Sequence, residues 1–185
     1  SGQLFVAEAT GVLRKAALEL YLSKPTFLPE RHEVELRVLQ QGDDKKCLTY
    51  VLVEGTCGGG RRVAGNRCLS AITLKINQYA RACALPRRSC WAQILMISSR
   101  FERQGHGLFL FRYVERLLSA HHGVDVLVCY PADKWAELFW RACGFEERRV
   151  SLLPVCDLVP TDRGGCLVPE MQSGTGVHLA RWEKA

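Results

Sequence analysis

The spacing of hydrophobic residues near the start of the chain predicts a helix followed by two strands. Apolar residues recur at helical intervals over residues 4–22, which predicts an amphipathic helix that ends before Pro25. Residues 34–38 alternate apolar and charged side chains, as a half-exposed strand does. Turn-forming residues at 41–44 separate this segment from a second strand at 47–54. The chain is therefore expected to begin with a long helix.

The rest of the pattern alternates strands with helices. The expected strands are residues 68–76, 91–97, 124–129, 152–159 and 177–182. The expected helices are residues 108–120 and 133–143, and Gly144 follows where a helix end favours a left-handed residue. Residues 55–66 and 77–89 read as irregular connections. This order favours an α+β fold with a mixed sheet flanked by helices.

Composition is that of an ordinary globular chain. Of 185 residues, 48% are hydrophobic and 24% are charged, which excludes collagen-like, coiled-coil and disordered classes. The length favours a single domain over residues 1–185. No apolar run approaches the roughly 18 residues of a membrane span, and no secretory leader is visible. We therefore expect an intracellular protein with no membrane partner.

Charge and cysteine content narrow the chemistry. The net charge of +6 favours an anionic partner, such as a phosphate-bearing cofactor, a nucleic acid or an acidic protein surface. None of the nine cysteines stands in a C-x-x-C spacing, and no histidines cluster with them. We interpret them as reduced thiols and expect no metal, with one surface disulfide or a redox thiol as the alternative.

Residues 97–108, Ile-Ser-Ser-Arg-Phe-Glu-Arg-Gln-Gly-His-Gly-Leu, stand out because they join a buried strand to a helix. Backbone N–H groups of a glycine-bearing turn at a helix N-terminus bind anions. Gly105 and Gly107 leave the backbone open to a diphosphate. The turn is not a P-loop, and Leu110 stands where a dinucleotide-binding turn needs a third glycine. A tight turn without a ligand is the alternative.

A second segment, residues 132–145, reads Ala-Asp-Lys-Trp-Ala, then Phe-Trp, then Gly-Phe. Together the two segments resemble the GNAT superfamily of acyl-CoA-dependent N-acetyltransferases, and most of all the histone acetyltransferases of the general-control-nonderepressible type. The resemblance covers residues 90–146. It implies a central mixed sheet of six to seven strands and acetyl-CoA as cosubstrate.

The resemblance also implies a set of cofactor-binding residues. A strand ending Leu95, Met96 and Ile97 would lend backbone groups to the pantetheine arm and the acetyl carbonyl. Trp135 takes the place of a tyrosine beside the cofactor. Phe139 and Trp140 would lie near the thioester, or else form the core face of their helix. The turn residues that would bind the diphosphate are Glu102, Arg103, Gln104, Gly105, His106, Gly107 and Leu108.

Three positions depart from the family pattern. The expected helix at 4–22 stands where the family has a strand and then helices. Glu102 replaces a glutamine or arginine, and a carboxylate there weakens phosphate binding unless it points away. Trp91 occupies the position of the general-base glutamate, and an indole accepts no proton. The catalytic residue is therefore unassigned.

Other ionisable groups were weighed as the missing base. Glu54, Asp133 and Glu137 are acids that the pattern does not place. His106 fits a cofactor or surface role better than that of a base. The pair at 121–122 lies at a helix end, which suits imidazolium.

The expected function is acetyl transfer from acetyl-CoA to a lysine amine of a protein. A histone tail is one candidate substrate, which would imply a chromatin-associated complex and a nuclear location. Two alternatives stay open. One is acetylation of an N-terminal or small amine, whose lower pKa of about 7.7–8.0 demands less of a base. The other is a catalytically degenerate GNAT domain that acts as a CoA-binding or protein-interaction module.

Overall fold

The computed structural model describes residues 3–24, 31–39, 47–55, 67–78, 90–147 and 179–182. The chain divides into two compact units. One comprises Ser1–Leu74 and Leu95–Leu117, and the other comprises Lys75–Ile94 and Leu118–Ala185. A single domain over the whole chain stays a prediction.

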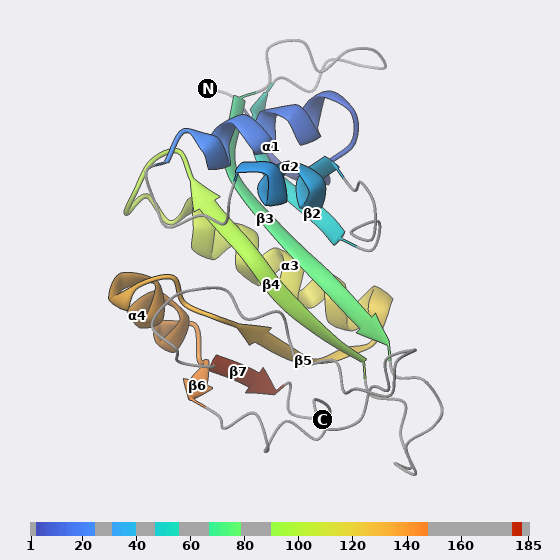
Figure 1. The fold of residues 1–185 in the computed structure, drawn as a ribbon, viewed down its shortest axis with the longest axis vertical. Coiled ribbons are helices and arrows are strands. Elements are labelled where there is room, and N and C mark those ends of the chain that lie inside the picture. Colours follow the sequence, from blue (N-terminus) through green and yellow to red (C-terminus); the bar gives the residue numbers. More distant parts are fainter. Residues whose placement is uncertain are drawn as a thin grey trace. The chain divides into compact units, whose positions relative to one another are not determined.

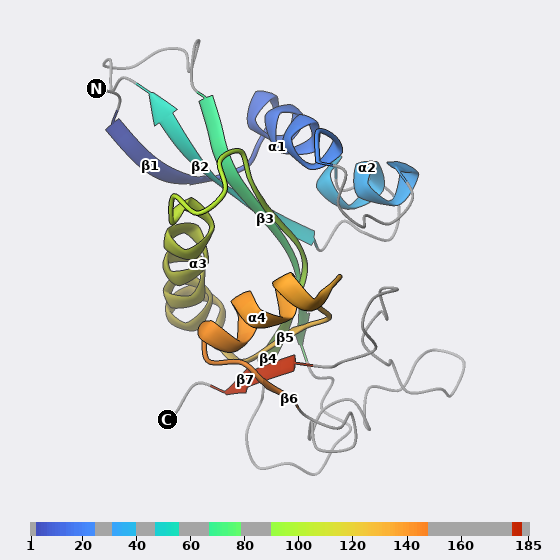
Figure 2. The ribbon, with the colours of Figure 1, turned by 90° about the vertical axis from the view of Figure 1, so that its left-hand side faces the viewer.

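The first unit is a sheet with helices on both faces. Its strands follow the order β1 (Gln3–Glu8), β2 (Cys47–Gly55), β3 (Arg67–Gln78) and β4 (Cys90–Ser99). Residues 75–78 of β3 and 90–94 of β4 belong to the second unit. β1 runs antiparallel to β2, with Gln3 opposite Gly55 and Glu8 opposite Tyr50. The helices α1 (Val12–Leu22) and α2 (Arg31–Leu39) lie on one face, and α3 (His106–His122) lies on the other (Figures 1 and 2).

The core of the first unit lies between the two N-terminal helices and the sheet. Tyr21 is fully buried, and its hydroxyl lies 3.0 Å from the Thr73 Oγ1 of β3. Thr73 Oγ1 in turn lies 2.9 Å from Thr49 Oγ1 of β2, so hydrogen bonds satisfy these buried hydroxyls. Apolar side chains from α1, α2, β2 and β3 form the rest of this core. These include Ala17, Leu20, Val34, Val38, Val51, Val53 and Ala71.

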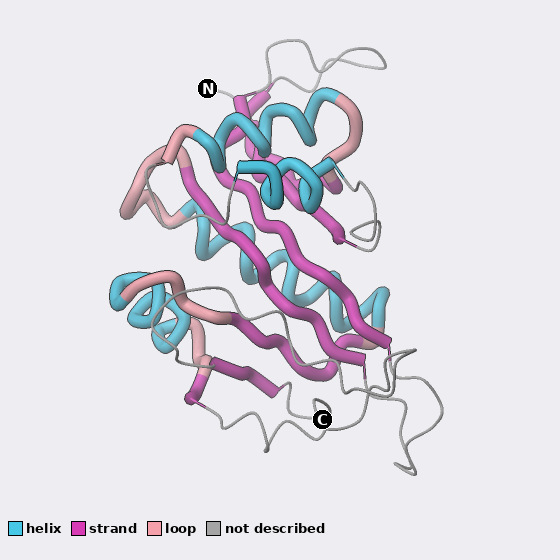
Figure 3. The backbone as a smooth tube through the Cα atoms, viewed as in Figure 1, coloured by secondary structure: helices cyan, strands magenta, loops and turns pink. Residues whose placement is uncertain are grey.

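The second unit holds the remaining strands and α4 (Lys134–Ala142). β5 (Val124–Cys129) runs parallel to β4 over Cys90 to Ile94. β7 (Leu179–Trp182) lies between β5 and the two-residue β6 (Glu146–Glu147) and is antiparallel to both (Figure 3). Asp133 caps α4, because its Oδ1 accepts a 2.8 Å hydrogen bond from the Ala136 N–H.

Two expected elements at the N-terminus are wrong. Residues 4–22 form a strand and then a helix instead of one helix. The backbone of Gly11, with φ 47°, is not helical, so the helix begins only at Val12. Residues 34–38 belong to α2, where Val34 and Val38 are both fully buried at a spacing of one helical turn. The chain thus begins with a strand and then helices, which removes the first departure from the family pattern.

The other described elements confirm the mixed α+β fold. The strands expected at 47–54, 68–76, 91–97 and 124–129 form, as do the helices at 108–120 and 133–143. Gly144 has φ 92° at the end of α4. The strand expected at 152–159 and most of the two expected loops lie outside the described residues. With β6 only two residues long, the count of six to seven strands stays a prediction. Among the described residues, no helix combines the length and apolar character that crossing a membrane requires.

Candidate functional site

The turn between β4 and α3 leads into the N-terminus of a long helix, a place where proteins bind anions. Arg103 and Gly105 are both left-handed, with φ 59° and 78°. The Phe109 N–H donates a 2.9 Å hydrogen bond to the Gly105 carbonyl, which begins the helical pattern of α3. The first N–H groups of a helix have no partner within the helix and carry its positive dipole. They are therefore available to an anion.

Gly105 and Gly107 serve the turn for different reasons. A β-carbon at Gly105 would meet nothing within 4 Å, so only its φ of 78° requires glycine. A β-carbon at Gly107 would lie 2.9 Å from the Ser99 Oγ, so close packing excludes it. The predicted pair of glycines thus combines one conformational and one steric requirement.

Hydrogen bonds to β3 fix the start of the turn. The Arg100 N–H donates to the Leu69 carbonyl at 2.8 Å, and Arg100 Nε donates to the Cys68 carbonyl at 3.0 Å. Ser70 Oγ donates to the Ser98 carbonyl at 2.8 Å and lies 2.9 Å from the Ser99 Oγ. The turn therefore starts from an anchored strand end instead of a loose loop.

Aromatic and cationic side chains line the same turn. The Arg67 guanidinium lies 4.6 Å from the centre of the Phe101 ring, and the His106 ring meets Phe101 edge-on at 6.4 Å. His106 Nδ1 is buried, and no described residue hydrogen-bonds it. His106 is thus packed into the turn, which fits its expected role better than that of a base.

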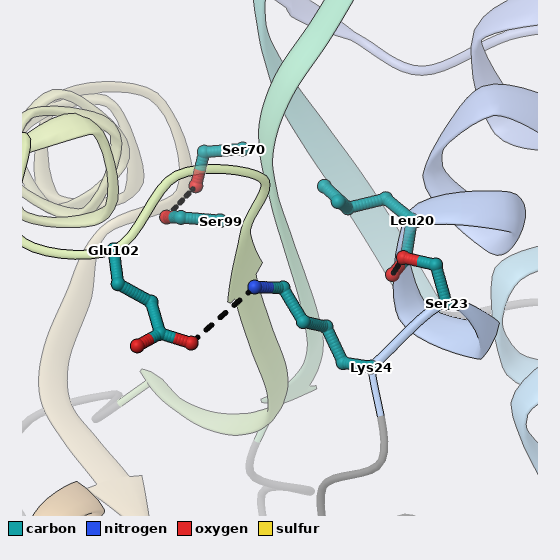
Figure 4. A network of polar contacts seen from close by, with 6 residues as sticks. All are labelled: Leu20, Ser23, Lys24, Ser70, Ser99 and Glu102. Atoms are coloured by element: carbon teal, nitrogen blue, oxygen red, sulfur yellow. Dashed lines mark hydrogen bonds and ion pairs between the residues drawn. The ribbon is translucent and has the colours of Figure 1, made fainter.

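Glu102 is paired. Its Oε1 lies 3.4 Å from the Lys24 Nζ, and Figure 4 shows the two side chains pointing toward one another. The carboxylate that departs from the family pattern is therefore drawn toward a cation from the end of α1.

The end of β4 holds the three strand residues expected to contact the cofactor. Leu95 and Met96 are buried and Ile97 is half-buried. The last paired residues of β4 and β5 are Ile94 and Cys129, so residues 95–99 continue past that pairing. The contact of these three residues with a cofactor stays a prediction.

The tryptophans of α4 differ in their exposure to solvent. Trp140 is buried and packs on the rings of Phe139 and Phe145 at 4.9 and 5.1 Å, so the core interpretation of this residue is confirmed. The Trp135 residue is 76% exposed. Its contact with a cofactor stays a prediction.

The acids weighed as bases have other partners or no assigned role. The Asp133 carboxylate caps α4, and Glu137 accepts a 2.7 Å hydrogen bond from Arg141 Nε. Glu54 lies half-buried in β2. The backbone of Trp91 is opposite Val126 in β5. The residue that would act as general base in place of the glutamate stays unassigned.

Four of the nine cysteines are buried and form no disulfide: Cys47, Cys68, Cys129 and Cys143. Burial raises the pKa of the Cys68 thiol to about 11, which keeps it protonated at neutral pH. The reduced-thiol interpretation is confirmed for these four. In the described part of the chain, no three His, Cys, Asp or Glu side chains are grouped to hold a metal ion.

Sequence reasoning missed Lys24, Arg67 and Ser70. Each lies about 30 to 80 residues from the turn in sequence, and the sheet and α1 bring it there. No local pattern marks such residues.

Solved structures with a similar fold include acetyltransferases. An acetyltransferase of the GNAT family from Staphylococcus aureus matches with a TM-score of 0.64 at 13% identity, over 98% of this chain and 100% of that one. Arabidopsis thaliana NAA60 in complex with acetyl-CoA matches with a TM-score of 0.62 at 10% identity, over 97% and 98%. The ribosomal-protein-S18-alanine N-acetyltransferase from Escherichia coli matches with a TM-score of 0.55 at 15% identity, over 96% and 91%.

These similarities show that the chain has the fold of GNAT acetyltransferases. No protein-family profile matches the sequence, and no curated protein matches it significantly. Nothing in the comparisons singles out the histone-modifying type within the superfamily.

Proposed function

We propose that this protein is an acetyl-CoA-dependent N-acetyltransferase and that its turn 102–108 binds the diphosphate of the cofactor. The observation that carries the proposal is the turn itself, with Arg103 and Gly105 left-handed at the N-terminus of α3. The fold supports it, because NAA60 of the same fold is known in complex with acetyl-CoA.

The chain's own groups suit acetyl transfer. When bound, acetyl-CoA supplies an activated thioester. The backbone of Met96 and Ile97, beyond the last β4–β5 pair, is the part of the strand that would polarise the acetyl carbonyl through an N–H group. The turn would hold the opposite end of the cofactor through backbone donors, with no side-chain chemistry required of it.

The acceptor we propose is a lysine amine of a protein, which is what the sequence motifs imply. We extend the proposal to a histone tail as substrate, a chromatin-associated complex and a nuclear location, because the two motifs most resemble those of the histone-modifying type. A lysine amine has a pKa of about 10.4 and must lose a proton before it attacks.

An N-terminal α-amine is the second candidate acceptor. The observation that favours it is Trp91, which stands at the position of the family's general base. An α-amine, with a pKa of about 7.7–8.0, is partly neutral at physiological pH and needs less help. The S18-alanine N-acetyltransferase, a protein of the same fold, is named for acetylation of an alanine, whose only amine is the α-amine.

Titration calorimetry with acetyl-CoA tests the turn. We expect micromolar binding that Gly105→Asp abolishes, because the new carboxylate would lie among the anion-binding N–H groups. Aspartate tolerates a left-handed backbone better than most residues, so the fold should survive. Gly105→Asn keeps the shape without the charge and should lose less affinity.

The matched control is Gly123→Asp. Gly123 has a similar φ of 60° but follows the other end of α3, so this variant should bind acetyl-CoA as the wild type does. Equal binding by Gly105→Asp and the wild type would contradict the assignment of the turn.

A thiol-release assay then identifies the acceptor. Histone-tail peptides with blocked N-termini report lysine transfer, and lysine-free peptides with free N-termini report α-amine transfer. Turnover only with the second set would replace the lysine proposal by its alternative. Acetyl-CoA binding without turnover on any peptide or small amine would identify a binding module.

A further inference from the structure

The ion pair between Lys24 and Glu102 joins two segments that are 78 residues apart. The Nζ–Oε1 distance is 3.4 Å, and the side chains are 21% and 81% exposed respectively. The lysine side chain is thus largely enclosed, whereas the glutamate side chain is exposed to solvent. This asymmetry indicates that Lys24 determines where the carboxylate lies.

The backbone of Lys24 is tied to the end of α1. Its N–H donates to the Tyr21 carbonyl at 3.2 Å, and Ser23 Oγ donates to the Leu20 carbonyl at 2.8 Å. Leu20 and Tyr21 are both buried, with 1% of the surface of each residue exposed. The ammonium therefore extends from a rigid, core-anchored helix end.

Glu102 needs such a partner because of where it stands. It precedes the left-handed Arg103 in the turn whose N–H groups form the candidate anion site. A carboxylate is itself a good ligand for the N–H groups of a helix N-terminus. A Glu102 side chain without its cation would repel a diphosphate and compete with it for the same donors.

We propose that Lys24 is a positioning residue that holds the Glu102 carboxylate away from turn 102–108 and so keeps the turn open to a diphosphate. The identity of that diphosphate as part of acetyl-CoA rests on the proposed function. Lys24 thereby compensates for the acidic residue at the first position of the turn. An ion pair whose carboxylate is exposed to solvent adds little to stability, so the main effect of Lys24 falls on binding.

A double-mutant cycle tests this, with inorganic pyrophosphate and acetyl-CoA as separate probes in calorimetry at constant ionic strength. Lys24→Met should weaken both ligands about fivefold, the scale of one unit-charge interaction at 4 Å in water. Lys24→Arg should keep wild-type affinity. In the Glu102→Gln background, Lys24→Met should change either affinity less than about twofold, since no carboxylate is left to hold.

Acetyl-pantetheine lacks the diphosphate. It therefore distinguishes an effect of Lys24 on diphosphate binding from a general effect on the structure, which would weaken all ligands. Its affinity should be the same with and without Lys24. Lys15→Met removes one charge from the exposed side of the same helix and should leave all three ligands unaffected.

The outcomes separate the two proposals. If the wild type binds pyrophosphate but not acetyl-CoA, and the cycle still shows coupling, the proposed function fails and the role of Lys24 stands. Equal losses on Lys24→Met with and without Glu102 overturn the role of Lys24 and leave the function intact. A wild type that binds neither probe overturns both.

Discussion

Gly107 and Ser99 approach one another so closely that a β-carbon on the glycine would lie 2.9 Å from the serine Oγ. The serine hydroxyl cannot easily turn away, because it lies 2.9 Å from the Ser70 Oγ. Ser70 already donates to the Ser98 carbonyl, so Ser99 is the donor to Ser70. The first turn of α3 is thereby seated directly on the end of β4.

Gly107→Ala should therefore displace the start of α3. Overpacking of this kind costs about 1–3 kcal/mol of unfolding free energy. Moving the backbone donors of the turn should also weaken acetyl-CoA binding about tenfold, because hydrogen bonds and ligand positioning depend on small distances. Denaturant unfolding and calorimetry measure the two effects.

Ser99→Ala supplies the control for that variant. Alone it removes one hydrogen bond and should cost about 1 kcal/mol. Combined with Gly107→Ala it removes the clashing oxygen, so the pair should be more stable than the sum of the single effects predicts. Strict additivity would show that the contact with Ser99 is not what excludes a side chain at Gly107.

Tyr21 reaches through the core to Thr73, and its loss tests the packing of α1. Tyr21→Phe leaves Thr73 with Thr49 as its remaining hydroxyl partner, 2.9 Å away. We expect a loss of about 1–2 kcal/mol of unfolding free energy, typical of a buried hydrogen bond. Tyr113→Phe, at a 46% exposed tyrosine, should change stability by less than about 0.5 kcal/mol. Equal effects of the two variants would mean that the buried hydroxyl contributes nothing.

The fold could be predicted wherever one hydrophobic period dominated. β4 and β5 are apolar runs, and α3 has a clear helical face, so their positions follow from the sequence. The N-terminal elements were ambiguous. Val34 and Val38 are four residues apart, a spacing that fits both a strand face and one helical turn, and only packing against β2 and β3 decides between them.

The site could be predicted only as far as it is local. The turn, its two glycines and the helix that follows are contiguous, so their pattern is readable. Lys24 and Ser70 reach the turn through tertiary structure, and nothing in their neighbourhoods indicates it. The sequence also suggested Asp133 as a possible base, whereas the structure uses its carboxylate as a helix cap.

The capping role of Asp133 predicts a specific pattern of substitutions. Asp133→Ala should cost about 1 kcal/mol of unfolding free energy, because the Ala136 N–H loses its acceptor. Asp133→Asn and Asp133→Ser should retain most of the stability, since both cap helices well. If Asp133 were instead the general base, Asp133→Asn would abolish turnover while preserving stability. Unfolding curves and acetyl-transfer rates for the three variants decide between these roles.

Buried tyrosines should make the protein sensitive to alkali. Burial above all, and then the charges of Glu8 and Tyr113, raise the pKa of Tyr50 to about 12. An unfolded tyrosine ionises near pH 10, so the unfolded state releases its proton first and gains relative to the folded state above that pH. The stabilising effect is complete below pH 10 and is lost between pH 10 and 12. Burial raises the pKa of Tyr21 in the same direction.

In Tyr50→Phe the unfolding free energy should fall less steeply between pH 10 and 12. The difference in slope against pH should correspond to the release of up to one proton per molecule. Urea unfolding at half-unit pH intervals measures the slope. Tyr113→Phe also removes a charge that acts on Tyr50, so its slope should change by less than that of Tyr50→Phe. An unchanged slope in Tyr50→Phe would place the alkaline transition on other groups.

The absence of an acid at position 91 predicts the pH dependence of the reaction. Without a general base, the rate follows the fraction of neutral amine, so kcat/KM for a lysine peptide should rise about tenfold per pH unit from 7 to 9. For an α-amine peptide the same profile should level off near pH 8. Trp91→Glu places there the acid that the resemblance to histone acetyltransferases implies. It should flatten the profile and raise the rate at pH 7 by about 10²-fold or more if the carboxylate is well placed. Trp91→Gln introduces a side chain of the same size as glutamate without the proton acceptor, so it should keep the wild-type slope.

A wild-type profile already flat between pH 7 and 9 would mean that another side chain of this protein takes the amine proton. The half-buried Glu54 would then be the next acid to replace.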